Sequence, residues 1–250
     1  MMGSLVIHPL HLGTIGRDKS IFTYLKNTGT QIEAPLLAWY IGGGKHHILV
    51  DTGGHDPEAT ELHGPYRREP DQDPLSQLAA LGVRAEDIDV VILTHLHWDH
   101  ATNAHLFPRA RIYVQRRELQ YAVAPLAPHR WAYEAYPPVP LHSDRYKVLD
   151  GDAEIADGVQ VYLTPGHTPG LQGVAVHAAD TVYFLAGDNV PLAEGWEARQ
   201  GYGTMPCPDA IHAVHMDLEV YLASLRRIER LGDVIIPSHD WKALERREYR

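Results

Sequence analysis

Four side chains that commonly bind metals lie within six residues of this chain, in the run His95-Leu96-His97-Trp98-Asp99-His100. The run follows directly on the apolar segment 88–94, which is typical of a buried strand. Three imidazoles crowded at one strand end repel one another when protonated, and a bound cation explains such clustering most simply. The run therefore predicts a fold that builds a metal site at the end of a strand.

Three more residues of the same chemical kind follow apolar, strand-like runs. Each comes three or four residues after such a run, and the residues are His167, Asp188 and His239. Ligand sites in α/β proteins lie beyond the carboxyl ends of strands, so side chains delivered by several strand ends converge. We expect all of these residues to share one site.

Length and composition are those of a globular chain. With 250 residues, 44% of them hydrophobic, we expect a single domain over residues 1–250. The formal net charge of −10 argues against a nucleic-acid partner, because such binders carry surplus Lys and Arg. No segment is long and apolar enough to span a membrane.

Location and assembly are less constrained by the sequence. The single cysteine, Cys207, excludes an intramolecular disulfide, and the first residues lack the basic region of a signal peptide. We expect a cytoplasmic protein that acts on a small-molecule substrate. A homodimer stays open.

Strand-like runs alternate with helical patterns, which indicates a layered α/β fold. Strands are expected at 36–41, 47–50, 89–93, 111–114, 146–149, 159–163, 171–176, 182–185 and 234–236. Helices are expected at 75–81, 116–122 and 210–231, with Gly232 as the C-terminal cap of the last.

Two long segments, 11–35 and 125–140, fit no regular pattern and are predicted to be loops. In the second, Trp131, Tyr133 and Tyr136 either form an apolar wall for a substrate or simply cover the core. We expect Trp98 to be a packing residue, and histidines outside the motifs, such as His129, to be structural.

In order and spacing, the motifs resemble those of the metallo-β-lactamase superfamily, over nearly the whole span 36–240. The resemblance implies an αββα four-layer sandwich of two mixed β-sheets with outer helices. It also implies two metal sites that share one bridging carboxylate. The first site would contain His95, His97 and His167, the second Asp99, His100 and His239, and the bridge would be Asp188. Asp51 would support the site from behind the ligands, its alternative role being a polar cap at a strand end.

Within the superfamily, the chain is most similar to N-acyl homoserine lactonases and other small lactonases, in length and in the segments 48–53 and 93–101. Secreted β-lactamases, glyoxalase II relatives, flavodiiron proteins and nucleic-acid-processing members differ in ligand set or in added domains. One departure concerns the lactonases too, because they usually carry a carbonyl-polarising tyrosine three residues after the bridging aspartate. That position here is Pro191. The residues that could replace the tyrosine are Tyr24, Asn189, Trp196 and Tyr202.

The resemblance implies a dinuclear hydrolase that opens a lactone, with N-acyl homoserine lactones as one candidate substrate. Two divalent ions would share a water and lower its pKa towards neutrality, and Asp99 would carry a proton to the leaving group. Imidazole and carboxylate ligands suit zinc, and Mn, Fe, Co or Ni are also compatible. Three alternatives stay open: a mononuclear iron oxidoreductase like the persulfide dioxygenases, a hydrolase of another ester, thioester or amide, and a non-catalytic metal-binding protein.

Overall fold

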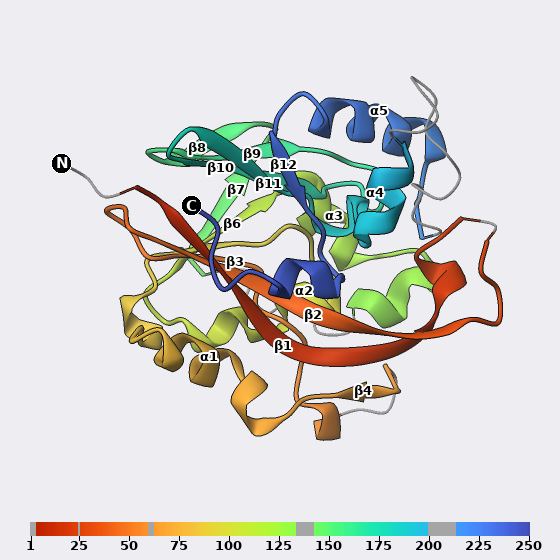
Figure 1. The fold of residues 1–250 in the computed structure, drawn as a ribbon, viewed down its shortest axis with the longest axis horizontal. Coiled ribbons are helices and arrows are strands. Elements are labelled where there is room, and N and C mark those ends of the chain that lie inside the picture. The colour runs from red at the N-terminus through yellow and green to blue at the C-terminus, as the bar shows by residue number, and fades with distance from the viewer. Residues whose placement is uncertain (1–3, 25, 60–62, 134–142, 200–213) are drawn as a thin grey trace.

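Two mixed β-sheets lie face to face in the computed structural model, with helices on both outer faces (Figure 1). The structure describes residues 4–24, 26–59, 63–133, 143–199 and 214–250. Within those ranges, no helix combines the length and the apolar character that a bilayer span requires. The expected αββα four-layer arrangement is confirmed.

The larger sheet has seven strands in the order β4-β1-β2-β3-β5-β6-β7. They are β1 (Val6–Asp18), β2 (Gln31–Gly42), β3 (Ile48–Val50), β4 (Tyr66–Arg67), β5 (Val90–Ile92), β6 (Arg111–Gln115) and β7 (Tyr146–Leu149). Strands β3, β5, β6 and β7 run parallel to one another, and β1 pairs antiparallel with both β2 and β4.

The smaller sheet has five strands in the order β12-β11-β10-β9-β8. They are β8 (Ala153–Ala156), β9 (Val159–Leu163), β10 (Gln172–Ala178), β11 (Thr181–Leu185) and β12 (Val234–Ile236). Strand β12 is parallel to β11, and the other neighbours are antiparallel.

Helices cover the outer face of each sheet (Figure 1). The larger sheet packs against α1 (Pro74–Ala80), α2 (Trp98–Ala101) and α3 (Arg116–Val123). The smaller sheet packs against α5 (Leu218–Ile228) and against Trp196 of α4 (Ala193–Arg199). A 3₁₀ helix, Ala127–Tyr133, follows α3.

Strand β5 illustrates why these segments read as continuous apolar runs. Successive side chains of a strand point to opposite faces. Val90 and Ile92 pack between the two sheets, and Val91 packs under the helices with Leu78. Because both faces are covered, both sets of side chains must be apolar. Each strand predicted from the sequence accordingly overlaps an observed strand.

The prediction of an irregular loop over 11–35 is wrong. Strand β1 continues to Asp18 and β2 begins at Gln31, and the two pair antiparallel over most of their length. Histidines and glycines interrupt the apolar alternation of β1. Pairing with β2 satisfies the backbone of this segment, which its own side-chain pattern did not reveal.

The prediction for the last helix is wrong at both ends within the described residues. The helix begins at Leu218, after Asp217 caps it by accepting a hydrogen bond from the backbone N–H of Val220 at 3.0 Å. It ends at Ile228, so Gly232 is not its cap. A Cβ at Gly232 would lie 2.6 Å from Phe184 Cβ, so this glycine permits close packing on the smaller sheet. Residues 210–213 lie outside the described residues.

Candidate metal centre

Five strand ends lead into one end of the sandwich. Strand β5 is followed by the run that contains His95, β9 by the turn to His167, β11 by Asp188 and β12 by His239. Gly166, with φ +148°, packs so tightly on Tyr221 of α5 that a side chain there would collide with that residue. Strand β3 ends next to Asp51.

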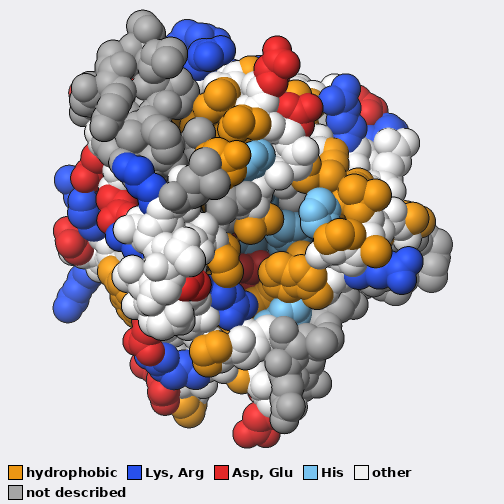
Figure 2. Space-filling view, turned by 90° about the vertical axis from the view of Figure 1, so that its right-hand side faces the viewer, with side chains coloured by type: hydrophobic (Ala, Val, Ile, Leu, Met, Phe, Trp, Pro, Cys, Tyr) orange, Lys and Arg blue, Asp and Glu red, His pale blue; other side chains and the backbone are white. Residues whose placement is uncertain are grey.

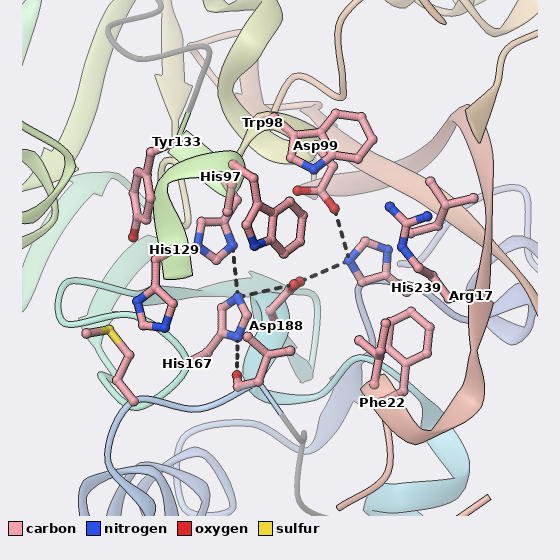
Figure 3. Close-up of a pocket in the computed structure, with 16 residues that line it drawn as sticks. Arg17, Phe22, His97, Trp98, Asp99, His129, Tyr133, His167, Asp188 and His239 are labelled. Carbon is pink, nitrogen blue, oxygen red and sulfur yellow. Dashed lines mark hydrogen bonds and ion pairs between the residues drawn. The ribbon is translucent and has the colours of Figure 1, made fainter. Parts of the chain in front are cut away.

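The structure brings all seven predicted site residues together. Three groups have potential ligand atoms within 4.8 Å of one another: His95, His97 and His167; His95, His100 and Asp188; and Asp99, His100 and His239. In the first group, His97 Nδ1 and His167 Nε2 lie 3.1 Å apart. Figure 3 shows His97 and His167 on one side of Asp188 and His239 on the other.

Asp188 lies between the first group (His95, His97 and His167) and the third group (Asp99, His100 and His239). Its Oδ1 is 3.1 Å from His100 Nε2 and 3.2 Å from His239 Nε2, and its Oδ2 is 3.5 Å from His167 Nε2. Ser238 holds the carboxylate in place by donating from Oγ to Oδ1 at 2.8 Å. Each carboxylate oxygen thus faces a different group, as a bridging ligand requires.

Hydrogen bonds behind the site orient its imidazoles. His167 Nδ1 lies 2.6 Å from the carbonyl oxygen of Val214, and His239 Nδ1 lies 3.0 Å from that of Pro35. His95 Nδ1 lies 3.1 Å from Thr94 Oγ1. When Nδ1 of a histidine is engaged in this way, Nε2 is left to bind a cation.

Asp51 combines both roles considered for it. Its Oδ2 is 2.8 Å from His100 Nδ1, so it orients that imidazole. It also accepts hydrogen bonds from the backbone N–H of Thr94 at 2.7 Å and from Thr94 Oγ1 at 2.8 Å, which closes the end of the neighbouring strand. Its backbone has φ 58°, a left-handed conformation that aspartate tolerates better than most residues.

The electrostatics differ between the groups. Burial, together with neighbouring imidazoles, lowers the pKa values of His95 and His97 well below the usual range, and burial also lowers the pKa of His167. Burial opposes charge on His100 and His239 as well, but the nearby carboxylates, Asp188 foremost, together outweigh it and raise both pKa values. The first group therefore consists of neutral imidazoles.

The donor set fits divalent cations. His95 Nε2 is buried and has no hydrogen-bond partner among the described residues. An imidazole nitrogen in this condition is costly to bury unless it binds something. Neutral imidazoles beside carboxylates are the ligands that zinc and similar metals take, so these residues could hold two such ions.

Sequence reasoning missed one buried residue behind the site, Glu118 of α3. Its carboxylate accepts hydrogen bonds from Leu96 N (3.1 Å), Tyr133 Oη (2.9 Å), Thr168 Oγ1 (2.7 Å) and Gly170 N (3.0 Å). These contacts tie together the loops on either side of the first group. The available signal was its position four residues before buried Ala122, on the apolar face of the helix.

A pocket opens over the site, with about 680 Å³ of empty space including its mouth, and five of the seven residues line it: His97, Asp99, His167, Asp188 and His239. Figure 2 shows histidine and acidic side chains in a hollow among hydrophobic ones. Its apolar walls include Ile15, Ile21, Phe22, Trp131, Val214 and Met216.

Several aromatic residues of the pocket have more than one contact. Tyr133 lines the pocket and is also buried against Glu118. Trp98 stacks on His63 at 4.1 Å between ring centroids, as a packing residue does, and its edge reaches the pocket. His129 lines the pocket too, contrary to expectation. Tyr136 lies outside the described residues.

None of the described candidates for the missing tyrosine lines this pocket. Asn189 donates from Nδ2 to the carbonyl oxygen of Thr164 at 2.6 Å. Tyr24 packs edge-on against His215, and Trp196 packs with the α5 cluster. Tyr202 lies outside the described residues.

Comparison with known proteins finds similarity to N-acyl homoserine lactonases. An N-acyl homoserine lactonase of Bacillus cereus is 26% identical over 242 residues, which cover 91% of this chain and 89% of the relative. The N-acyl homoserine lactonase AttM of Azorhizobium caulinodans is 30% identical over 239 residues, covering 86% and 85%. A solved N-acyl homoserine lactone hydrolase, with the product N-hexanoyl-L-homoserine bound at its catalytic metal center, has the same fold. The TM-score is 0.78 at 23% identity, over 98% of this chain and 96% of that one.

A family model also matches most of the chain. The model of the metallo-beta-lactamase superfamily matches residues 35–239, which include all seven site residues. Together with the αββα fold, this match shows that the chain belongs to the metallo-β-lactamase superfamily.

Proposed function

We propose that this protein is a dinuclear metal-dependent hydrolase that opens a lactone ring, with N-acyl homoserine lactones as the first candidate substrates. The observation that carries the proposal is the position of Asp188, with one carboxylate oxygen towards His100 and His239 and the other towards His167. The names of the relatives support the choice of substrate.

Each group of residues would hold one ion. His95, His97 and His167 would hold the first, Asp99, His100 and His239 the second, and Asp188 would bind both. When bound, the ions would acidify a water, so that hydroxide forms near neutral pH, and would polarise the ester carbonyl.

The residues of the chain supply the remaining chemistry. The side chain of Asp99 lies at the pocket floor and is 12% exposed, with Oδ2 3.9 Å from His239 Nε2. We assign it the transfer of a proton from the attacking water to the ring oxygen as that bond breaks. The apolar walls would bind an acyl chain and exclude water from the reaction.

Four finer assignments belong to this proposal. We propose that zinc is the native metal, because histidine and carboxylate ligands suit it. We also propose that residues 1–250 form one domain, that the protein is cytoplasmic and that it forms a homodimer. Metal analysis tests the identity of the metal, and limited proteolysis tests the single domain. Cell fractionation tests the location, and light scattering tests the homodimer.

The decisive experiment for the function is a hydrolysis panel with metal-reconstituted protein. It would contain N-acyl homoserine lactones of several chain lengths, simple lactones, linear esters, thioesters and amides. We expect ring opening of lactones to exceed hydrolysis of matched linear esters, with two metal ions per chain.

Other results would identify the alternatives. One iron per chain with oxygen consumption on a persulfide would identify an iron oxidoreductase. Preference for a linear ester, thioester or amide would identify another hydrolase. Two bound metals without turnover on any compound would identify a non-catalytic metal-binding protein.

A further inference from the structure

Arg17 brings a positive charge into the wall of the pocket. It lies on β1, where it pairs with Ile32 of β2, and it points to the same face as Ile15, two residues earlier. Figure 3 shows its guanidinium beside His239, on the side of the pocket away from His97. A paired strand carries this residue, so the sheet fixes the position of its backbone.

Backbone carbonyls hold the guanidinium in place. Nη1 donates to the carbonyl oxygens of Gly16 at 2.9 Å and Gly64 at 3.3 Å, and Nη2 donates to that of His63 at 3.2 Å. A guanidinium has five N–H donors, so the described residues leave two of them for a ligand.

The charge of Arg17 also lacks a carboxylate in ion-pair contact within the described part of the chain. Burial lowers its pKa, and the negative charge of Asp99 opposes that effect from a greater distance. Arg17 is partly buried and its charge has no close carboxylate among the residues described, so it attracts a ligand with negative or strongly polarised oxygen atoms.

We propose that Arg17 donates to the carbonyl oxygen of the scissile ester and stabilises the negative charge that this oxygen acquires. The inference rests on the proposed function. It gives Arg17 the task that a tyrosine performs in the similar lactonases, since Pro191 occupies the tyrosine's position and the described alternatives do not line the pocket.

The step balances without a further reactant. Water gives one proton to Asp99, and its oxygen forms a bond to the carbonyl carbon. The π electron pair of the carbonyl moves to the oxygen held by Arg17. When the ring C–O bond breaks, its electron pair goes to the ring oxygen, which takes the proton from Asp99. The carboxylic acid that results releases the second proton of the water to solvent, and the oxygen beside Arg17 becomes part of the product carboxylate, so Arg17 also binds the ring-opened product.

The test compares Arg17→Met with a matched control, Arg145→Met, in metal-loaded protein. Arg145 also donates to backbone carbonyls, including that of Ala110 at 3.1 Å, but it does not line the pocket. For Arg17→Met we expect kcat on a lactone to fall about 100- to 1000-fold, the range for loss of one donor to a developing oxyanion. KM should change little, and the metal content should remain that of the wild type.

Two further measurements separate catalysis from structure. Arg17→Lys, which keeps the charge but not the fork of donors, should fall between the wild type and Arg17→Met in kcat. Calorimetry should show that the ring-opened product binds at least about tenfold more weakly to Arg17→Met, because a charge-assisted hydrogen bond to the carboxylate is lost. The product should bind Arg145→Met as it binds the wild type.

Several results would overturn the inference. The first is equal kcat values for Arg17→Met and Arg145→Met, and the second is a higher KM for Arg17→Met with unchanged kcat. The third is unchanged product binding by Arg17→Met. The fourth is a large loss of kcat in Tyr202→Phe with none in Arg17→Met. A wild-type enzyme that is inactive on all lactones would refute the proposed function and the inference with it. Full activity of Arg17→Met beside an active wild type would refute the inference alone.

Discussion

The two halves of the candidate metal centre are built from different chemistry. The first half consists of three imidazoles whose pKa values burial lowers. The second half contains the Asp99 carboxylate and two imidazoles, His100 and His239, whose pKa values the neighbouring carboxylates raise despite burial. The imidazoles of the first half are therefore neutral and can bind a cation without losing a proton. The imidazoles of the second half carry protons that a cation must displace.

The halves also differ in how the fold supports them. Asp51 contacts an imidazole of the second half directly, at His100 Nδ1. Glu118 supports the first half indirectly, by accepting hydrogen bonds from the loops that carry its ligands. One half depends on a side-chain contact and the other on loop geometry, so they should respond differently to mutation.

The largest expected effect is that of Asp188→Asn, because this residue faces both halves. We expect a loss of bound metal in both and a fall in lactone turnover of roughly a thousandfold or more, beyond the 10- to 100-fold that supporting residues cost. Metal analysis and steady-state kinetics measure the two effects. Asp150→Asn, at an exposed ion pair with Arg116, is the control and should match the wild type. Two tightly bound metals in Asp188→Asn would contradict the role of Asp188 as a ligand shared by both halves.

Removing one ligand from each half separates them. His97→Ala and His239→Ala should each lower turnover by at least about 100-fold, because each removes a metal contact outright. Each variant should retain one metal more tightly than the other, and chelator titration measures this. Loss of both metals in each variant would show that the halves cannot be filled independently.

Asp51→Asn should weaken the second half, which Asp51 contacts directly, more than the first half, which it reaches only through Thr94. The amide cannot accept from His100 and Thr94 as the carboxylate does, so we expect a loss of about 10- to 100-fold in affinity for one of two metals. A biphasic chelator titration would show one shifted phase. An equal shift of both phases would contradict the claim that Asp51 supports mainly the second half.

The pH dependence of metal binding distinguishes the halves without mutation. Raised pKa values at His100 and His239 mean that protons stay bound to a higher pH in the metal-free protein, so the affinity of the second half should rise as pH rises. The metal affinity of the second half should rise by up to about tenfold per pH unit for each displaced proton. The first half should change little over the same range, because its imidazoles are already neutral. Metal titrations between pH 6.5 and 8.5 measure the affinity of each half. Greater proton release on metal binding by the first half than by the second would contradict this prediction.

The smallest expected effect is that of Glu118→Gln. The amide keeps the size of the side chain but replaces one acceptor oxygen with a donor, which would face N–H or O–H groups. We expect a loss of about 2 kcal/mol in the free energy of unfolding, the scale for an unsatisfied buried group, and only a few-fold loss of turnover. Chemical denaturation and kinetics check both. A loss of turnover as large as that of Asp51→Asn would place Glu118 in the chemistry itself.

The parts of the fold predictable from sequence were those where one local pattern decides the structure. Strand β5 is covered on both faces, so its residues are all apolar and the run stands out. Strand β1 mixes His8, His11, Gly13 and Gly16 with apolar residues, and only its pairing with β2 makes it regular. The start of α5 depended on the cap at Asp217, which lies inside a longer helical pattern.

The candidate site was predictable to a similar degree. The residue types at strand ends, together with the family resemblance, predicted which seven residues meet. Arg17 and Glu118 carry no motif. Arg17 enters the pocket because β1 extends past the predicted loop boundary, and Glu118 because α3 packs against the metal-bearing loops. Such contacts are set by tertiary packing, which spacing along the chain does not encode.

The most direct measurement is a crystal structure of the zinc-loaded protein with anomalous scattering recorded at the zinc edge. We predict two peaks, one among His95, His97 and His167 and one among Asp99, His100 and His239, with the carboxylate of Asp188 between them. A single peak, or peaks away from these side chains, would contradict a dinuclear centre bridged by Asp188.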